Sequence, residues 1–198
     1  MPITLTPVVL SAGVLALTPC LVRADFARLT LQSDPGDWIG QGNNYDIVYD
    51  TTASPASLVA ASATLPIGGT PSYLSFTLDR NWGGDTYSRL EFSSWELGTP
   101  LTAGVYLDAQ RAAFASPGHP GLDVSFQHRG SNTLTGQFTV ISIAYAPDGS
   151  LANFTATFEQ HSEGAAPALH GMLVYSAPAP SGALVLAGAG VLALRRRR

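Results

Sequence analysis

The chain has 198 residues and a formal net charge of −4 at pH 7, with 14 acidic residues against 10 Lys and Arg. All ten basic residues are arginines; four end the chain and one is Arg23. Residues 25–176 therefore carry five arginines, no lysine and all fourteen carboxylates. Nucleic-acid binding requires concentrated Lys and Arg, because these residues neutralise the phosphates. The composition therefore excludes nucleic acid as a partner and favours an acidic exterior.

The amino-terminal segment predicts export. Residues 8–22 are mostly apolar, and Val22-Arg23-Ala24 places aliphatic or small residues at the two positions that signal peptidase reads. We expect residues 1–24 to be a signal peptide, removed by signal peptidase after Ala24. Cys20 is the only cysteine, so the processed protein would contain no disulfide although its compartment permits one.

The next segment, residues 25–176, has a length that suits one domain with its own core. Apolar and polar residues alternate in short runs, and this period of two predicts strands at 28–31, 72–79, 88–92, 122–126, 137–145 and 154–158. Residues 56–63 also suggest a strand, residues 34–71 look rich in loops, and residues 146–150 predict a hairpin turn. The predicted fold is all-β: a single antiparallel β-sandwich, jelly-roll-like, with a barrel as the alternative.

Two aspartates in the first predicted loop are candidate metal ligands. Asp34 and Asp37 lie near Asp46, Asp50 and two asparagines, and such oxygen groups are the ligands that calcium prefers. Their spacing lacks the regularity of an EF-hand loop, and turn formation by aspartate explains Asp34-Pro35-Gly36-Asp37 equally well. Calcium is the one cofactor that the sequence suggests; no other is expected.

A second candidate site is the loop at residues 81–87. Trp82, Asp85 and Tyr87 are residue types that bind sugars, because aromatic planes pack against sugar rings while carboxylates bond the hydroxyl groups. The alternative is that Trp82 packs within the domain. This loop makes a glycan a candidate partner.

The segment around His161 is the third candidate. On a strand, Glu159, His161 and Glu163 would share one face, which suits metal binding or acid–base chemistry, and His128 and His170 could join them in space. A hydrogen-bonded network that fixes the following loop is the alternative. The chain contains no nucleophile elbow, phosphate-binding loop or zinc spacing, so we predict that it is not an enzyme.

Several motifs in the domain resemble an uncharacterised family of exported bacterial β-sandwich proteins. They are residues 35–40, 104–106, 129–132, 158–164 and 167–171. In that family, cysteines stand at the positions of Ser131 and Ser162, which implies a bridge between two loops. Both positions are serine here.

The carboxyl-terminal residues predict a segment that interacts with the membrane. A run of 18 uncharged residues from Ala177 to Leu194 would span about 27 Å as a helix, enough for a bilayer core. Together with its flanks this run resembles the PEP-CTERM sorting domain, which implies processing by an exosortase-type enzyme, although Ala179 replaces the central Glu of that motif. A plain membrane anchor, with the arginines in the cytoplasm, is the alternative. The flanking residues are Pro178, Ala179, Pro180, Arg195, Arg196, Arg197 and Arg198.

These features together predict three segments: a signal peptide at 1–24, a β-domain at 25–176 and a sorting tail with a transmembrane helix at 177–198. We expect an exported protein that the inner membrane anchors before processing and that then resides at the cell surface or outside the cell. Its predicted role is non-catalytic, either structural or interacting with a matrix component. A carbohydrate-binding module and a secreted hydrolase are the alternatives.

Overall fold

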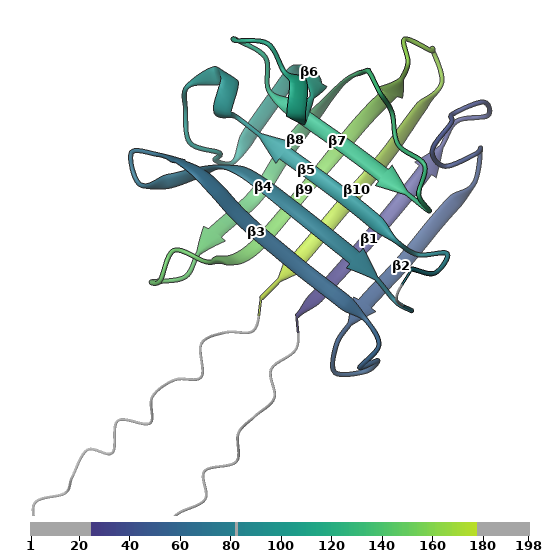
Figure 1. The fold of residues 1–198 in the computed structure, drawn as a ribbon, viewed down its shortest axis with the longest axis horizontal. Coiled ribbons are helices and arrows are strands. Elements are labelled where there is room, and N and C mark those ends of the chain that lie inside the picture. The colour runs from purple at the N-terminus through teal and green to yellow at the C-terminus, as the bar shows by residue number, and fades with distance from the viewer. Residues whose placement is uncertain (1–24, 82, 178–198) are drawn as a thin grey trace, which may run out of the picture.

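The structure is a computed structural model that describes residues 25–81 and 83–177. This part of the chain forms ten strands and two short 3-10 turns, η1 (Trp95–Leu97) and η2 (Ala112–Phe114), which confirms the all-β prediction (Figure 1). The strands are β1 (Phe26–Ser33), β2 (Asn44–Asp50), β3 (Leu58–Ile67), β4 (Thr70–Asp79), β5 (Ser88–Ser93), β6 (Gly104–Arg111), β7 (Gly121–Phe126), β8 (Leu134–Tyr145), β9 (Leu151–Ser162) and β10 (Ala168–Ser176).

Alternation of side chains explains why these segments are strands with one buried face. On β4 the side chains of Leu74, Phe76 and Leu78 are fully buried, while the residues between them face outward. The same period of two holds along β9, where Phe154 and Phe158 point into the core. The strands predicted from this pattern are confirmed.

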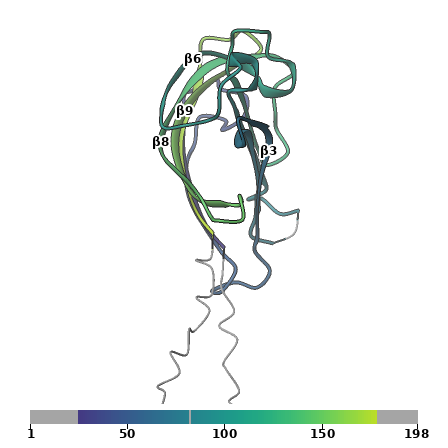
Figure 2. The same ribbon diagram turned by 90° about the vertical axis from the view of Figure 1, so that its left-hand side faces the viewer.

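All ten strands belong to one sheet in the order β2-β1-β10-β9-β8-β6-β7-β5-β4-β3. The sheet curls into two facing layers, a back layer of β2, β1, β10, β9 and β8 and a front layer of β7, β5, β4 and β3, whose strands cross those of the back layer (Figures 1 and 2). The two edge strands β2 and β3 approach each other, so the sheet is nearly closed into a barrel. Continuous pairing through β6 distinguishes this architecture from the predicted sandwich of two separate sheets.

Strand β6 joins the two layers. It pairs antiparallel with β8, and its last residues pair parallel with β7 through Gln110↔Gly121 and Arg111↔Leu122. The chain can make this parallel pair because η2 and the loop after it carry it over from the end of β6 to the start of β7. The sheet is therefore not purely antiparallel, contrary to the prediction.

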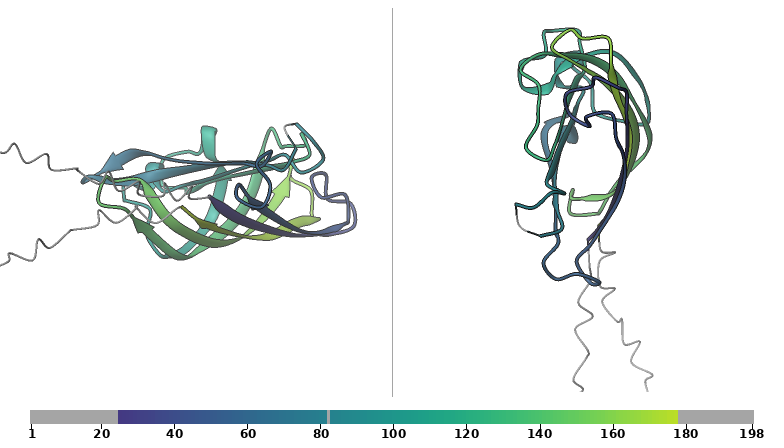
Figure 3. Two further views of the ribbon diagram at one scale, coloured as in Figure 1. Left: turned by 90° about the horizontal axis from the view of Figure 1, so that it is seen from below. Right: turned by 90° about the vertical axis from the view of Figure 1, so that its right-hand side faces the viewer.

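The two layers face each other across the core (Figure 3), and buried aromatic rings from both layers pack together between them. The ring of Phe76 on the front layer stacks on Phe154 of the back layer with 5.2 Å between centroids. Phe92 lies 5.1 Å from Phe154 and 5.4 Å from Phe138. Such pairs add to the hydrophobic stabilisation that burial provides, so this cluster holds the layers together.

The turn between β8 and β9 is the predicted hairpin. Ala146 N donates to Ser150 O at 2.8 Å, and Gly149 N donates to Ala146 O at 2.9 Å. Gly149 adopts φ 84°, which glycine tolerates better than any other residue. This prediction is confirmed. Within residues 34–71, which the sequence indicated to be rich in loops, the strand suggested at 56–63 corresponds to β3, and β2 is a strand that the sequence did not predict.

The two ends of the described domain lie side by side. Phe26 pairs with Ser176, and seven residues further along β1, Ser33 pairs with Leu169. At about 3.3 Å per residue the two pairs are about 23 Å apart. We call the end at Ser33 and Leu169 the distal end; it carries the loops at 34–43, 127–133 and 163–167, which are tied together by bonds such as Trp38 Nε1 to Gly130 O at 3.1 Å (Figure 1).

The predicted signal peptide and the tail from Pro178 onward lie outside the described residues. Within residues 25–81 and 83–177, no helix has the length and apolar character needed to cross a bilayer.

Candidate functional site

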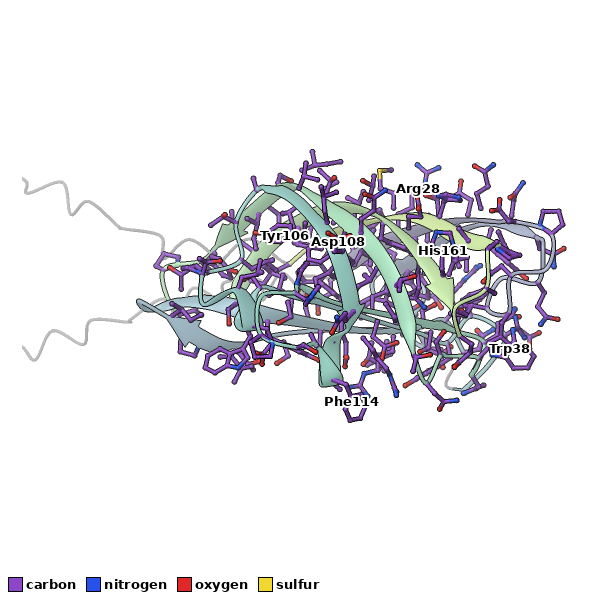
Figure 4. All side chains as sticks on the ribbon, turned by 90° about the horizontal axis from the view of Figure 1, so that it is seen from above. Arg28, Trp38, Tyr106, Asp108, Phe114 and His161 are labelled. Atoms are coloured by element: carbon purple, nitrogen blue, oxygen red, sulfur yellow. The ribbon has the colours of Figure 1, made fainter. Side chains whose placement is uncertain are left out.

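A cluster of two histidines and two carboxylates lies on the outer face of the back layer, toward the distal end. Glu159 and His161 project from β9, and His170 stands directly opposite Glu159 on β10. Asp34 follows the end of β1. We call these four residues the distal cluster; Figure 4 shows its His161 on the side of the molecule away from Phe114.

Glu159 is the centre of the distal cluster. Its Oε1 lies 3.1 Å from His161 Nε2, and its Oε2 lies 3.7 Å from His170 Nδ1. His170 Nε2 is 4.0 Å from Asp34 Oδ2, so acids and imidazoles alternate along the surface. Of the five residues that the sequence grouped as candidates, the structure brings Glu159, His161 and His170 together.

His161 has an oxygen atom facing each ring nitrogen. Nδ1 lies 2.9 Å from Ala166 O, and Nε2 faces the Glu159 carboxylate. Both contacts are hydrogen bonds only when the ring carries both protons. The hydrogen bond to His161 lowers the pKa of Glu159, and Gln137 and His170 act in the same direction.

A prediction follows for the pH dependence of stability. Because its folded-state pKa lies below the ordinary value of 4.5, Glu159 stabilises the fold above that pH, and this contribution is lost as the pH falls through the folded-state pKa. We expect Glu159→Gln to reduce the loss of unfolding free energy between about pH 5 and pH 3. Urea unfolding of both proteins at each pH measures the difference; equal losses in both would contradict the prediction.

Glu163 does not join the distal cluster. It lies beyond the end of β9 at Ser162 and has φ 52°, so the alternation of the strand no longer applies to it. Its carboxylate accepts hydrogen bonds from Asn132 N and from Thr133 Oγ1, the latter at 3.0 Å. These bonds, that of Asn132 first, lower the pKa of Glu163. Glu163 therefore holds the 127–133 loop, a role that the sequence did not predict.

His128 also lies elsewhere, with its ring stacked on Tyr87 at 4.9 Å between centroids and 9° between planes. This stack covers one face of Tyr87, one of the three predicted sugar-binding residues. Asp85 is exposed, and its carbonyl oxygen accepts a bond of 2.7 Å from Gln127 Nε2. Trp82 lies outside the described residues.

The predicted calcium ligands shape a turn. Asp37 is buried and accepts hydrogen bonds from Gly40 N at 2.7 Å and from Ser33 Oγ at 2.8 Å. Asp34 accepts a bond of 3.1 Å from Ala168 N, which ties this turn to β10. Among the described residues, no three His, Cys, Asp or Glu side chains are placed to hold a metal ion.

A hollow of about 540 Å³ lies beside the distal cluster on the back layer. Glu159, His170 and Gln137 line it together with threonines of three strands, Thr30, Thr139 and Thr157. These groups offer hydrogen bonds and few apolar contacts. The arrangement suits a polar surface contact better than a small-molecule site, which is usually lined by apolar and aromatic side chains.

Sequence reasoning missed a second hollow, of about 460 Å³, on the outer face of the front layer. We call it the β5–β7 cleft; its charged residues are Arg89, Glu91, Arg111 and Asp123. Glu91 occupies an outward position of β5 and yet is only 4% exposed. The strand pattern could not reveal this burial, because it depends on a turn that crosses the strands.

Ser131 and Ser162 meet at the distal end. The Oγ atom of Ser131 donates a 2.8 Å hydrogen bond to that of Ser162, and both residues are buried. The two positions that the family resemblance singles out are therefore in contact. In this chain a hydrogen bond joins the two segments.

No protein-family model, no curated protein and no solved structure matches the chain.

Proposed function

We propose that the protein is an exported β-domain that its carboxyl-terminal tail anchors in the inner membrane before processing and that then resides at the cell surface or outside the cell, with a non-catalytic role as an interaction or structural module. The observation that carries this proposal is the pairing of Phe26 with Ser176, which places both ends of the domain at one end of the sheet. A tail that continues from Ala177 would leave the distal end facing away from the membrane.

The distal end suits a contact surface. Its loops are fixed to one another by bonds such as that from Asp34 N to Ala168 O at 2.9 Å, and from Glu163 N to Thr133 O at 2.9 Å. Trp38 remains 55% exposed there (Figure 4). A rigid, polar surface with an exposed aromatic residue loses little conformational entropy on binding a partner.

The tail is tested by replacing all four terminal arginines. We expect the alanine variant of residues 195–198 to lose normal membrane retention or processing, because the positive charges fix the orientation of the tail. Intact mass and fractionation of the protein from its native host measure both. The proposal expects the wild-type mass to lack residues 1–24 and the tail after about Ser176.

A lysine variant of residues 195–198 is the matched control, since it keeps the charge and removes the guanidinium groups. Wild-type processing of the lysine variant would show that processing depends on the positive charge of residues 195–198 and not on their guanidinium groups. Unchanged fractionation and mass of the alanine variant would contradict the sorting role. A full-length tail in the membrane fraction of the wild type would indicate a plain anchor.

A further inference from the structure

The β5–β7 cleft is built from two strands of the front layer and a turn that covers them. Glu91 on β5 stands directly opposite Asp123 on β7, and Ala113 of η2 contributes to the wall. Gly121 allows η2 to lie this close, because a Cβ atom there would be 2.8 Å from Ala112 Cα. The cleft is therefore a consequence of how the chain crosses from β6 to β7.

Each carboxylate in the cleft has an arginine partner. Arg111 Nε donates to Asp123 Oδ2 at 2.9 Å, and Arg111 Nη1 donates to Asn132 O at 3.2 Å. Glu91 forms an ion pair with Arg89. Two positive and two negative groups leave the cleft with no net charge.

The carboxylates are poorly solvated. Burial raises the pKa of Asp123, although the bond to Arg111 opposes the shift. Burial also raises the pKa of Tyr73, and its hydrogen bond with Glu91 adds to the effect. Such buried polar groups gain most from a ligand that offers hydrogen bonds, because water competes less there.

An aromatic ring projects beside the cleft. Phe114 follows Ala113 of the wall and is 71% exposed, which is unusual for so large an apolar side chain. The guanidinium carbon of Arg111 lies 5.1 Å from the centre of its ring. The ring projects outward from the domain (Figure 4), and most of it remains open to solvent.

We propose that the β5–β7 cleft binds a sugar residue of a neutral glycan. A charged ligand would upset the balance of the four ionic groups, whereas a hydroxyl group can donate to a carboxylate and accept from a guanidinium at the same time. The apolar face of the sugar ring would pack on Phe114. The cleft has a volume of about 460 Å³, and its polar lining offers hydrogen-bond partners to the hydroxyl groups of a sugar.

This inference rests on the proposed function in one respect: export would bring the protein to the compartment that contains the glycan. It places sugar binding on the front layer, away from the loop at 81–87 that the sequence suggested. A network that only held η2 on the sheet would explain the ion pairs. It would not require an exposed phenyl ring beside an open cleft.

The test is affinity electrophoresis of the processed protein from its host through gels containing dextran, xylan, galactomannan or, as an anionic comparison, alginate. We expect at least one neutral polysaccharide to retard the protein. Phe114→Ala should weaken that binding about tenfold, the equivalent of about 1.4 kcal/mol. Phe114 is exposed, so this variant should fold normally.

Glu91→Gln should weaken binding to the same polysaccharide as well, with its folding checked by thermal unfolding. Ile141→Ala is the control, because it removes another exposed apolar side chain, on β8 of the back layer and outside the cleft. The inference is overturned if no neutral polysaccharide retards the protein, if alginate alone does so, or if Phe114→Ala binds as the wild type does. Fractionation of Phe114→Ala should be normal, so a failure of sugar binding and a failure of sorting are distinguishable.

Discussion

Replacing Gln160 by Met should lower the free energy of unfolding by about 2–6 kcal/mol. The Gln160 side chain is fully buried; its Oε1 accepts from Val124 N at 2.8 Å, and its Nε2 donates to Val124 O at 3.0 Å. Methionine fills a similar volume and leaves both backbone groups without a partner inside the protein. Each such group costs about 1–3 kcal/mol, and urea unfolding measures the sum.

The cause of this dependence is the short pairing between β6 and β7. β5 pairs with β7 along one side, but on the other side β6 pairs with β7 only at Gly121 and Leu122. No strand of the described domain therefore lies beside Val124 on the β6 side. Gln160, on β9 of the back layer, supplies the donor and acceptor that a neighbouring strand would otherwise provide. A side-chain amide thus completes the sheet at the point where its two layers separate.

Two variants sharpen the test of Gln160. Gln160→Glu keeps the shape but removes the donor to Val124 O, so it should also destabilise the fold. Gln137→Met changes an exposed glutamine on β8 and should stay within about 0.5 kcal/mol of the wild type. If Gln160→Met unfolded at the wild-type urea concentration, the amide would not be completing the sheet.

Much of the strand content could be predicted from the sequence, because each strand has one buried and one exposed face. Leu74, Phe76 and Leu78 show this on β4, and the period of two follows directly from backbone geometry. Strand β2 was overlooked because the apolar Val48 between Ile47 and Tyr49 interrupts its alternation, and because it lies in a segment rich in Gly, Ser and Asn. Composition over a long window hides so short an alternation.

Strand pairing could not be predicted in the same way. Alternation identifies the face of a strand and carries no information about its neighbours, so one curled sheet and two stacked sheets give the same pattern. The parallel contact of Gln110 with Gly121 depends on where η2 places the chain. That placement depends on tertiary packing at Gly121, which no local pattern encodes.

For the candidate sites too, local pattern could be predicted from the sequence and contacts between distant strands could not. Glu159 and His161 were placed together correctly because two residues two apart on a strand share a face. Glu163 was misplaced because the strand ends one residue earlier. The β5–β7 cleft was missed because Glu91 and Asp123 are far apart in sequence and become neighbours only through the pairing of β5 with β7.

The double variant Ser131→Cys, Ser162→Cys should form a disulfide and raise the free energy of unfolding by about 3–4 kcal/mol. The two hydroxyl oxygens are 2.8 Å apart, and the residues are separated by 31 positions along the chain. A bridge across a loop of that length removes conformational freedom from the unfolded state. Urea unfolding with and without a reductant measures the gain, and thiol titration measures bond formation.

Either single variant is the control, because one cysteine at this contact cannot form the bridge and should gain nothing from oxidation. Free thiols in the oxidised double variant, or equal stability with and without reductant, would contradict the prediction. Ser131 lies in the 127–133 loop, and Ser162 is the last residue of β9. A disulfide between them would therefore join the loop to the end of β9, which Glu163 also connects by hydrogen bonds. Because one hydrogen bond contributes only about 1 kcal/mol, the bridge would make this part of the distal end markedly harder to open.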